Sequence, residues 1–179
     1  MSYLVRQLEK HHLPEDARLV EVLRVPTNTR ETRHRTLRST RVRFALFTPR
    51  VYDYPLSEMG SVPPYLCFCK YAVNQTPQEI LRSMEGKPFE GPTNGRLLDF
   101  CRTHPKRIPD RIAFLSSNGA YFYLKKNADG SHCLRALSDR DVLKRGWLFA
   151  LQPTTEEVVE DLEQIIQVED RMQELVAIH

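Results

Sequence analysis

A β-hairpin is the feature of this sequence that most restricts its fold. Two runs of residues that favour β structure, at 111–116 and 120–125, stand on either side of Asn118 and Gly119. Asn-Gly favours a tight turn whose twist matches that of paired antiparallel strands. The two runs therefore predict a hairpin, and any fold of this chain has to contain it.

Three other stretches predict additional strands. Residues 41–48 alternate polar and apolar side chains, and this period of two is typical of a half-buried strand. We interpret this stretch as the first strand of the core. Residues 65–73 are predicted as the second strand, and the apolar stretch 147–151 as the closing strand.

Short helices are predicted between these strands. Thr76 and Glu79 have the spacing of a capping box with a proline between them, so a helix should begin there. A second short helix is expected at 94–102, where apolar residues recur at helical spacing. Residues 138–144 predict a single capped helical turn that ends at Gly146.

The last predicted element is a long amphipathic helix at 154–179. It opens with the capping-box sequence Thr-Thr-Glu-Glu and continues with apolar residues at helical spacing. These apolar residues are Val158, Leu162, Ile165, Met172 and Val176. Such a stripe has to be covered, and two interpretations stay open. The helix packs on its own sheet or N-terminal segment, or it docks on a partner or a second copy of the chain.

Charge is unevenly distributed along the chain. Segment 24–50 has eight arginines and one glutamate (net +7), whereas segment 154–179 has eight acids and one arginine (net −7). Six of the arginines form a cluster: Arg30, Arg33, Arg35, Arg38, Arg41 and Arg43. Such a cluster suits an acidic protein surface. Nucleic acid ranks lower because lysines and interleaved aromatic residues are absent from the cluster. The third interpretation is a solvated extension, or one neutralised by the acidic tail.

The order of the predicted elements from 41 to 151 is strand, strand, helix, strand, strand, short helix, strand. This order resembles the ubiquitin superfold, or β-grasp, in which a mixed sheet wraps around one helix. The local likeness lies in Leu137, Ser138, Asp139, Val142 and 147–151. Residues 110–162 also resemble the end of the Ras-binding-type domain in the N-terminal region of engulfment-and-motility proteins, and the related GTPase-binding regions of formins.

The resemblance implies an α+β, ubiquitin-like fold and a role in protein interaction. In Ras-binding-type domains, basic residues on the first strands pair with an acidic edge of a small GTPase, and Arg41 and Arg43 occupy the resembling strand. We therefore expect a non-catalytic adaptor with a protein partner, and with a second chain on the terminal helix. The alternative is a structural subunit of a large cytoskeletal or ribonucleoprotein assembly, whose Arg-rich segment contacts neighbouring chains or nucleic acid.

Catalytic activity and metal binding are the alternatives to this role. The sequence contains neither Gly-x-Ser-x-Gly nor His-Glu-x-x-His, so we expect no enzymatic activity and no cofactor. Cys67, Cys69, Cys101 and His104 have the donor atoms of a zinc site. The preferred interpretation is that the two cysteines at alternate positions of one strand pack as small apolar groups.

The chain of 179 residues is predicted to have three parts. These are an N-terminal segment and basic linker at 1–40, a β-grasp-like domain at 41–152 and the helix at 154–179. No apolar run approaches the roughly 20 residues that cross a bilayer, so we expect no membrane span. The low cysteine content fits the reduced thiols of the cytoplasm, where we expect the protein to act.

Overall fold

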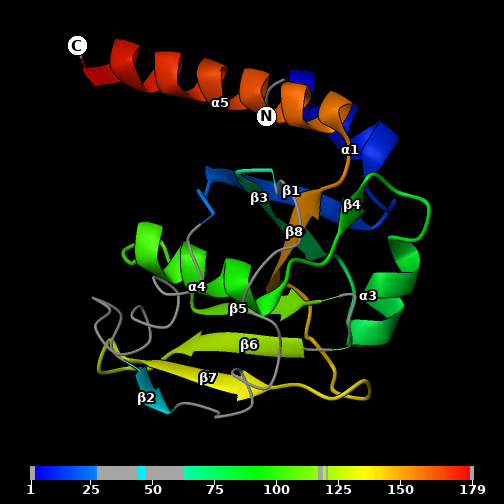
Figure 1. The fold of residues 1–179 in the computed structure, drawn as a ribbon, viewed down its shortest axis with the longest axis vertical. Helices are drawn as coiled ribbons and strands as arrows, with labels where there is room; N and C mark the ends of the chain where they lie inside the picture. Colours follow the sequence, from blue (N-terminus) through cyan, green and yellow to red (C-terminus); the bar gives the residue numbers. More distant parts are fainter. Residues whose placement is uncertain (1–2, 28–43, 47–62, 117–118, 120, 178–179) are drawn as a thin grey trace.

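The computed structural model describes residues 3–27, 44–46, 63–116, 119 and 121–177. In this part of the chain, helices and a mixed sheet form an α+β protein (Figure 1). The helices are α1 (Tyr3–His12), α3 (Pro77–Ser83), α4 (Asn94–Thr103) and α5 (Glu156–Ala177). The strands are β1 (Ala17–Arg24), β2 (Phe44–Leu46), β3 (Tyr65–Tyr71), β4 (Phe89–Glu90), β5 (Arg111–Leu115), β6 (Tyr121–Lys126), β7 (His132–Ala136) and β8 (Leu148–Pro153).

The strands follow the order β1-β3-β8-β5-β6-β7-β2, and β4 pairs with β8. Strand β8 lies inside the sheet, antiparallel to β3 and parallel to β5. Strands β5, β6 and β7 are antiparallel neighbours, and β2 is parallel to β7. The α+β class, the mixed sheet and the C-terminal helix agree with the sequence analysis, whereas the finer β-grasp arrangement is not confirmed.

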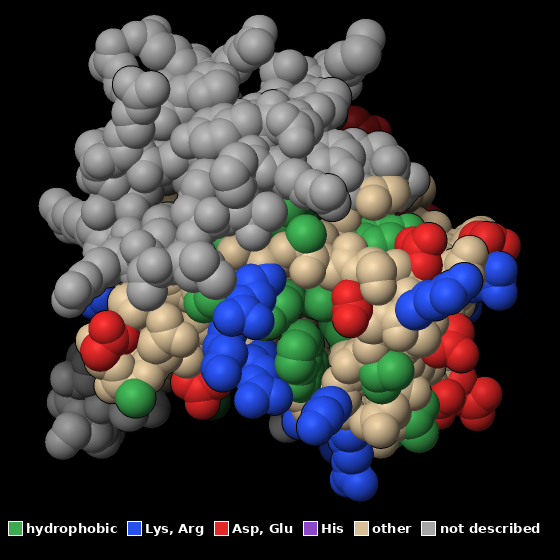
Figure 2. Space-filling model, turned by 90° about the horizontal axis from the view of Figure 1, so that it is seen from below, with side chains coloured by type: hydrophobic (Ala, Val, Ile, Leu, Met, Phe, Trp, Pro, Cys, Tyr) green, Lys and Arg blue, Asp and Glu red, His purple; other side chains and the backbone are tan. Residues whose placement is uncertain are grey.

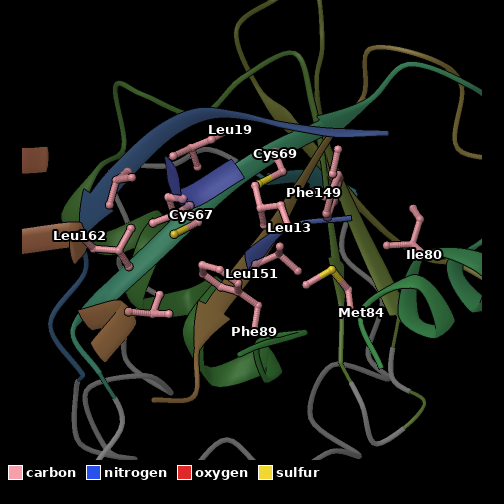
Figure 3. Close-up of a cluster of buried hydrophobic side chains, with 14 of the residues drawn as sticks. Leu13, Leu19, Cys67, Cys69, Ile80, Met84, Phe89, Phe149, Leu151 and Leu162 are labelled. Atoms are coloured by element: carbon pink, nitrogen blue, oxygen red, sulfur yellow. The ribbon is translucent and has the colours of Figure 1, made fainter. Parts of the chain in front are cut away.

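Helices α1 and α5 cover one face of the sheet over β1, β3 and β8 (Figure 1). The alternation of side chains along a strand places Cys67 and Cys69 of β3 on this face, together with Phe149 and Leu151 of β8. Figure 3 shows Leu162 of α5 in the same cluster. Burial of apolar surface, worth about 25 cal/mol for each Å², therefore holds both helices on the sheet.

Helix α4 covers the opposite face. The ring centroid of Phe100 lies 5.0 Å from that of Phe68 in β3 and 6.2 Å from that of Phe114 in β5. Phe122 and Leu124, alternate residues of β6, belong to the same buried cluster. The sheet is therefore packed between α4 on one side and the pair α1 and α5 on the other.

A buried guanidinium links α4 to the loops beside the sheet. Arg96 has no exposed surface; its Nη1 lies 3.4 Å from Asp99 Oδ2 and donates to Thr27 Oγ1 (3.3 Å). Its Nη2 donates to the carbonyl of Pro63 (3.2 Å). Thr27 follows β1 and Pro63 precedes β3, so Arg96 holds these two positions against the start of α4.

Several predicted elements are confirmed. Strands β5 and β6 pair as the expected hairpin, and α4 and α5 lie where helical spacing predicts them. The capping box of α3 is complete. Glu79 N donates to Thr76 Oγ1 (3.3 Å), and Thr76 N donates to Glu79 Oε2 (2.7 Å). These bonds satisfy donors that a helix start leaves unpaired.

Helix α5 has 22 residues and begins with two acidic side chains, which favour the positive end of the helix dipole. In Figure 1 it extends over β1 and β8 beside α1, and the C-terminus lies at its far end. Its many charged residues leave only one apolar stripe. Within the described part of the chain, every helix is too short or too polar to cross a membrane.

The predicted helical turn at 138–144 is confirmed only as a capped turn at its start, where Asp141 N donates to the carbonyl of Ser138 (3.2 Å) and Ser138 N donates to Asp141 Oδ2 (2.6 Å). It does not continue as a helix. Leu143 N donates to the carbonyl of Gln75 (2.8 Å), and Gln75 N donates to the carbonyl of Leu143 (3.1 Å). This isolated bridge engages the backbone groups of Leu143 with a distant segment, so they are not available for a helix.

Two predicted positions along the sheet also need correction. The stretch 41–48 is predicted as the first strand of the core, but β1 precedes it in the chain; it is described only at 44–46, where β2 ends the strand order beside β7. The segment 1–40 is placed outside the domain by the sequence analysis, but β1 pairs with β3 along its length. Residues 3–27 therefore contribute to the same sheet and core as the segment 41–152.

Candidate binding face

The part of the sheet formed by β5, β6 and β7 has a charged and aromatic face on the side where α1 and α5 cover β3 and β8. The strand register places Arg111 opposite Lys125, and Tyr123 opposite Arg135. Residues that lie opposite on antiparallel strands point to the same face. Trp147 directly precedes β8 and lies beside Arg111. We call Arg111, Tyr123, Lys125, Arg135 and Trp147 the basic aromatic face.

The aromatic members of this face are in mutual contact. The ring centroids of Tyr123 and Trp147 lie 5.4 Å apart, at an interplanar angle of 42°. The Cζ atom of Arg111 lies 5.3 Å from the centroid of the Trp147 ring, within the range of a cation–π interaction. Both rings are half-buried, whereas Arg111 is exposed. The aromatic pair is therefore fixed by the core beneath it and carries a cation on its outer side.

Arg135 completes the face on strand β7. Its Nε donates to Cys133 Sγ (3.2 Å), and Tyr123 is its neighbour on β6. The hydrogen bond to Cys133 and the nearby Tyr123 hydroxyl raise the pKa of Arg135. The guanidinium stays charged at any physiological pH, and the Arg135 side chain is exposed.

A hollow of about 510 Å³ adjoins the face at the start of β5 and the end of β6. It is lined by Asp110, Arg111, Lys125, Lys126, Asn127 and Ala128. Three cations and one carboxylate give this lining an excess of positive charge, which favours anions. Figure 2 views the molecule from below Figure 1, where β6 and β7 lie, and shows Lys and Arg side chains beside hydrophobic ones on the described surface.

The predicted arginine cluster lies outside the described residues. Its members are Arg30, Arg33, Arg35, Arg38, Arg41 and Arg43. Strand β2 begins at Phe44, the residue that follows Arg43, and β2 pairs with His132 and Cys133 of β7. Strand β2, which follows the last arginine of the cluster in the sequence, is thus the neighbour of β7, the strand that carries Arg135.

The residues predicted to bind a partner on the terminal helix have different environments. Val158, Leu162 and Ile165 are buried, each with at most 1% of its surface exposed, in the cluster between α5, α1 and the sheet. Met172 is 59% exposed. The first three residues are therefore buried within the chain, in agreement with the intramolecular interpretation, whereas Met172 is accessible. The side chain of Val176, the last residue of the predicted stripe, is outside the described part of the structure.

The four zinc candidates do not converge. Cys67 and Cys69 belong to the cluster under α5, whereas Cys101 belongs to the cluster under α4, on the other face of the sheet. The Nε2 atom of His104 is engaged with the carbonyl of Arg24 (2.9 Å). Burial raises the pKa of both β3 thiols and raises that of Cys101 to about 12, which disfavours thiolate ligands. The cysteines pack as apolar groups, as the sequence analysis prefers.

A second cavity, of about 550 Å³, lies between β1 and α5. Its charged groups are largely paired with each other or with neighbours. Glu163 accepts from the hydroxyl of Tyr65 (2.9 Å), and Arg107 forms an ion pair with Glu21 (2.6 Å). This cavity mixes both signs of charge, so it does not have the selectivity for anions that the basic aromatic face offers.

Sequence reasoning missed most of the basic aromatic face. Trp147 is predicted only as part of the closing strand at 147–151. Arg111, Lys125 and Arg135 lie on three strands, of which β7 is not predicted. One sequence signal could have indicated part of this face. In β6, Tyr123 and Lys125 alternate with the buried Phe122 and Leu124, so they point to the face of the sheet opposite to those two side chains. Comparisons of the chain with models of protein families, with curated proteins and with solved structures find no match.

Proposed function

We propose that this protein is a non-catalytic interaction module that binds a negatively charged macromolecule through the basic aromatic face. The observation that supports the proposal is the convergence of Arg111, Lys125 and Arg135 from three successive strands around a half-buried aromatic pair. Arginine and aromatic residues are enriched at the centres of binding interfaces. Exposed cations on one face also steer an acidic partner toward it.

A small GTPase with an acidic edge is the protein partner that the Ras-binding resemblance suggests. In that proposal the module is a cytoplasmic adaptor, and Arg135 of β7, the strand beside β2, contributes to its basic edge. The structural-subunit alternative uses the same face for a neighbouring chain or a nucleic acid within a large assembly. Both versions require a surface that attracts negative charge, and this shared requirement is tested first.

The test is a charge reversal with a matched control. The double variant Arg111→Glu/Arg135→Glu changes the face, and Arg6→Glu/Arg102→Glu changes net charge equally at exposed positions of α1 and α4. The wild type and the control should elute from immobilised heparin at similar salt concentrations, whereas the face variant should elute at a clearly lower concentration. Equal shifts for both variants would mean that only net charge matters, and would contradict the proposal.

The GTPase version is tested with the same proteins. Members of the Rho, Ras and Arf families, each loaded with GDP or a GTP analogue, are titrated against wild type and variants. The adaptor proposal expects one nucleotide-dependent complex that the face variant loses and the control keeps. If no family member binds the wild type, the GTPase is removed as the partner.

A further inference from the structure

We infer that the macromolecule held by this face is single-stranded nucleic acid, with bases against the Tyr123–Trp147 pair and phosphates at the surrounding cations. This inference rests on the proposed function and specifies its partner class. It depends on a combination that an acidic protein surface does not require, which is exposed cations and half-buried aromatic rings on one sheet face that α1 and α5 do not cover in the described part of the chain.

Each aromatic side chain of the face has an arginine side chain beside it. Arg111 lies over the Trp147 ring and Arg135 lies beside Tyr123, so each aromatic residue has a guanidinium next to it. Nucleobases stack on aromatic rings and on guanidinium planes, and this stacking stabilises the binding of single strands whatever the base. The phosphates that follow each base then lie within reach of side chains that carry positive charge.

The basic aromatic face lies on the broad surface of β5, β6 and β7. The face belongs to a sheet in which neighbouring strands are about 4.8 Å apart and residues rise about 3.4 Å along a strand. Arg111 and Arg135 are two strands apart and displaced by two residues in register, so their backbones lie roughly 12 Å apart, with Tyr123 and Lys125 between them. The grooves of a duplex admit a helix or a narrow ribbon, whereas a broad sheet surface receives unpaired bases. The arrangement therefore favours a single strand over a duplex.

The strands that carry the basic aromatic face are held rigidly by the core on their other side. The strands that carry the face bury Ile112, Phe122, Leu124 and Leu134 against α4 on their other side. The half-buried rings of Tyr123 and Trp147 are thus fixed before a ligand arrives. A platform that is already ordered loses little conformational entropy when a base stacks on it.

Trp147 makes the test direct, because it is the only tryptophan in the sequence. The full chain is titrated with a ten-residue oligouridylate and with an abasic ribose-phosphate oligomer of the same length. Tryptophan fluorescence reports on stacking, and the anisotropy of a labelled oligomer reports on binding. We expect quenching only with the oligouridylate, and binding of the abasic oligomer that is at least about tenfold weaker, equivalent to the loss of about 1.4 kcal/mol.

Variants separate stacking from charge. Trp147→Ala should weaken oligouridylate binding at least about tenfold, and Trp147→Phe should restore most of the affinity because a ring remains. Lys125→Ala removes only an exposed cation, so it should keep the preference for the base-bearing oligomer. With three phosphate contacts the salt slope of log K for the wild type should be about −2, and Lys125→Ala should reduce its magnitude by about 0.7. Circular dichroism checks that each variant is folded.

The outcomes distinguish this inference from the proposed function. Equal binding of the two oligomers, or an unchanged affinity in folded Trp147→Ala, overturns stacking but leaves a polyanion-binding face in place. Retention on heparin through the face without binding of either oligomer also overturns the inference, and favours an acidic protein as the partner. Loss of face-dependent retention on heparin overturns both.

Discussion

Strands β3 and β6 bury the same kind of residue under α4 but present different residues to the other side of the sheet. Toward α5, β3 presents Cys67 and Cys69, which are fully buried, whereas β6 presents Tyr123 and Lys125, which are half-buried and exposed. The difference follows the polarity of alternate residues, because both strands have the same period of two. The half of this face under α5 is therefore part of the core, whereas the half formed by β6 and β7 is a surface.

One row of paired residues crosses both halves. From β1 to β7 the register connects Leu19, Cys69, Phe149, Ala113, Tyr123 and Arg135. The row begins with buried apolar side chains and ends with an exposed cation. Hydrogen bonds between neighbouring strands connect the whole row. The packing of β1, β3 and β8 against α5 therefore also helps to position Arg135 at the other end of the row.

The largest effect is expected in the half covered by α5. Leu162→Ala removes a side chain with no exposed surface and leaves a cavity between α5 and the sheet, so it should lower the free energy of unfolding by about 2–5 kcal/mol. Met172→Ala, further along the same helix and 59% exposed, is the control and should change it by less than about 0.5 kcal/mol. Urea unfolding followed by circular dichroism measures both. Equal small effects would mean that α5 does not pack on the sheet.

A smaller effect is expected from His132 at the start of β7. Burial, with a lesser contribution from the charge of Lys126, lowers the pKa of His132 below its ordinary value of 6.5. Below about pH 6.5 the unfolded chain binds a proton that the folded chain does not. The free energy of unfolding should therefore fall as pH decreases from 7 to 5, by at most about 1.4 kcal/mol per pH unit.

The His132→Gln variant isolates this contribution. It should have a flatter dependence of unfolding free energy on pH than the wild type over the same interval. The difference between the two curves, measured by urea unfolding at several pH values, reports on this histidine alone. Parallel curves would show that His132 is not shielded from solvent on the inner side of β7.

The smallest effect on stability is expected on the basic aromatic face itself. Lys125→Ala and Arg135→Ala remove exposed side chains, so each should change the free energy of unfolding by less than about 0.5 kcal/mol. The same variants should reduce retention on heparin. A large loss of stability would show that these cations serve the fold, and the contrast between the two halves of the sheet would then disappear.

The local elements could be predicted from the sequence to different degrees. The capping box at Thr76, the Asn-Gly hairpin and the apolar stripe of α5 are confirmed because their signals act over a few residues. The end of the turn predicted at 138–144 could not be predicted, since Leu143 pairs with Gln75, which is distant in sequence. The position of β2 at the edge was also inaccessible, because strand order depends on pairings across the whole chain.

The candidate site shows the same limit. Sequence reasoning finds charge where it is contiguous, as in the arginine cluster that ends at Arg43. It does not find Arg111, Lys125, Arg135 and Trp147, which are spread over 37 positions and meet only through the register of β5, β6 and β7. It also groups Cys67 and Cys101, which the sheet separates.

The sequence by itself determined helices α3, α4 and α5 and the hairpin of β5 and β6, because capping, turn chemistry and periodicity depend on neighbouring residues. The tertiary structure decided which faces are covered: it buried the first half of the α5 stripe, left its end at Met172 exposed and gathered distant cations around Trp147. The physical reason is that burial and strand pairing join residues that are far apart along the chain, and their partners are chosen by the free energy of the whole fold.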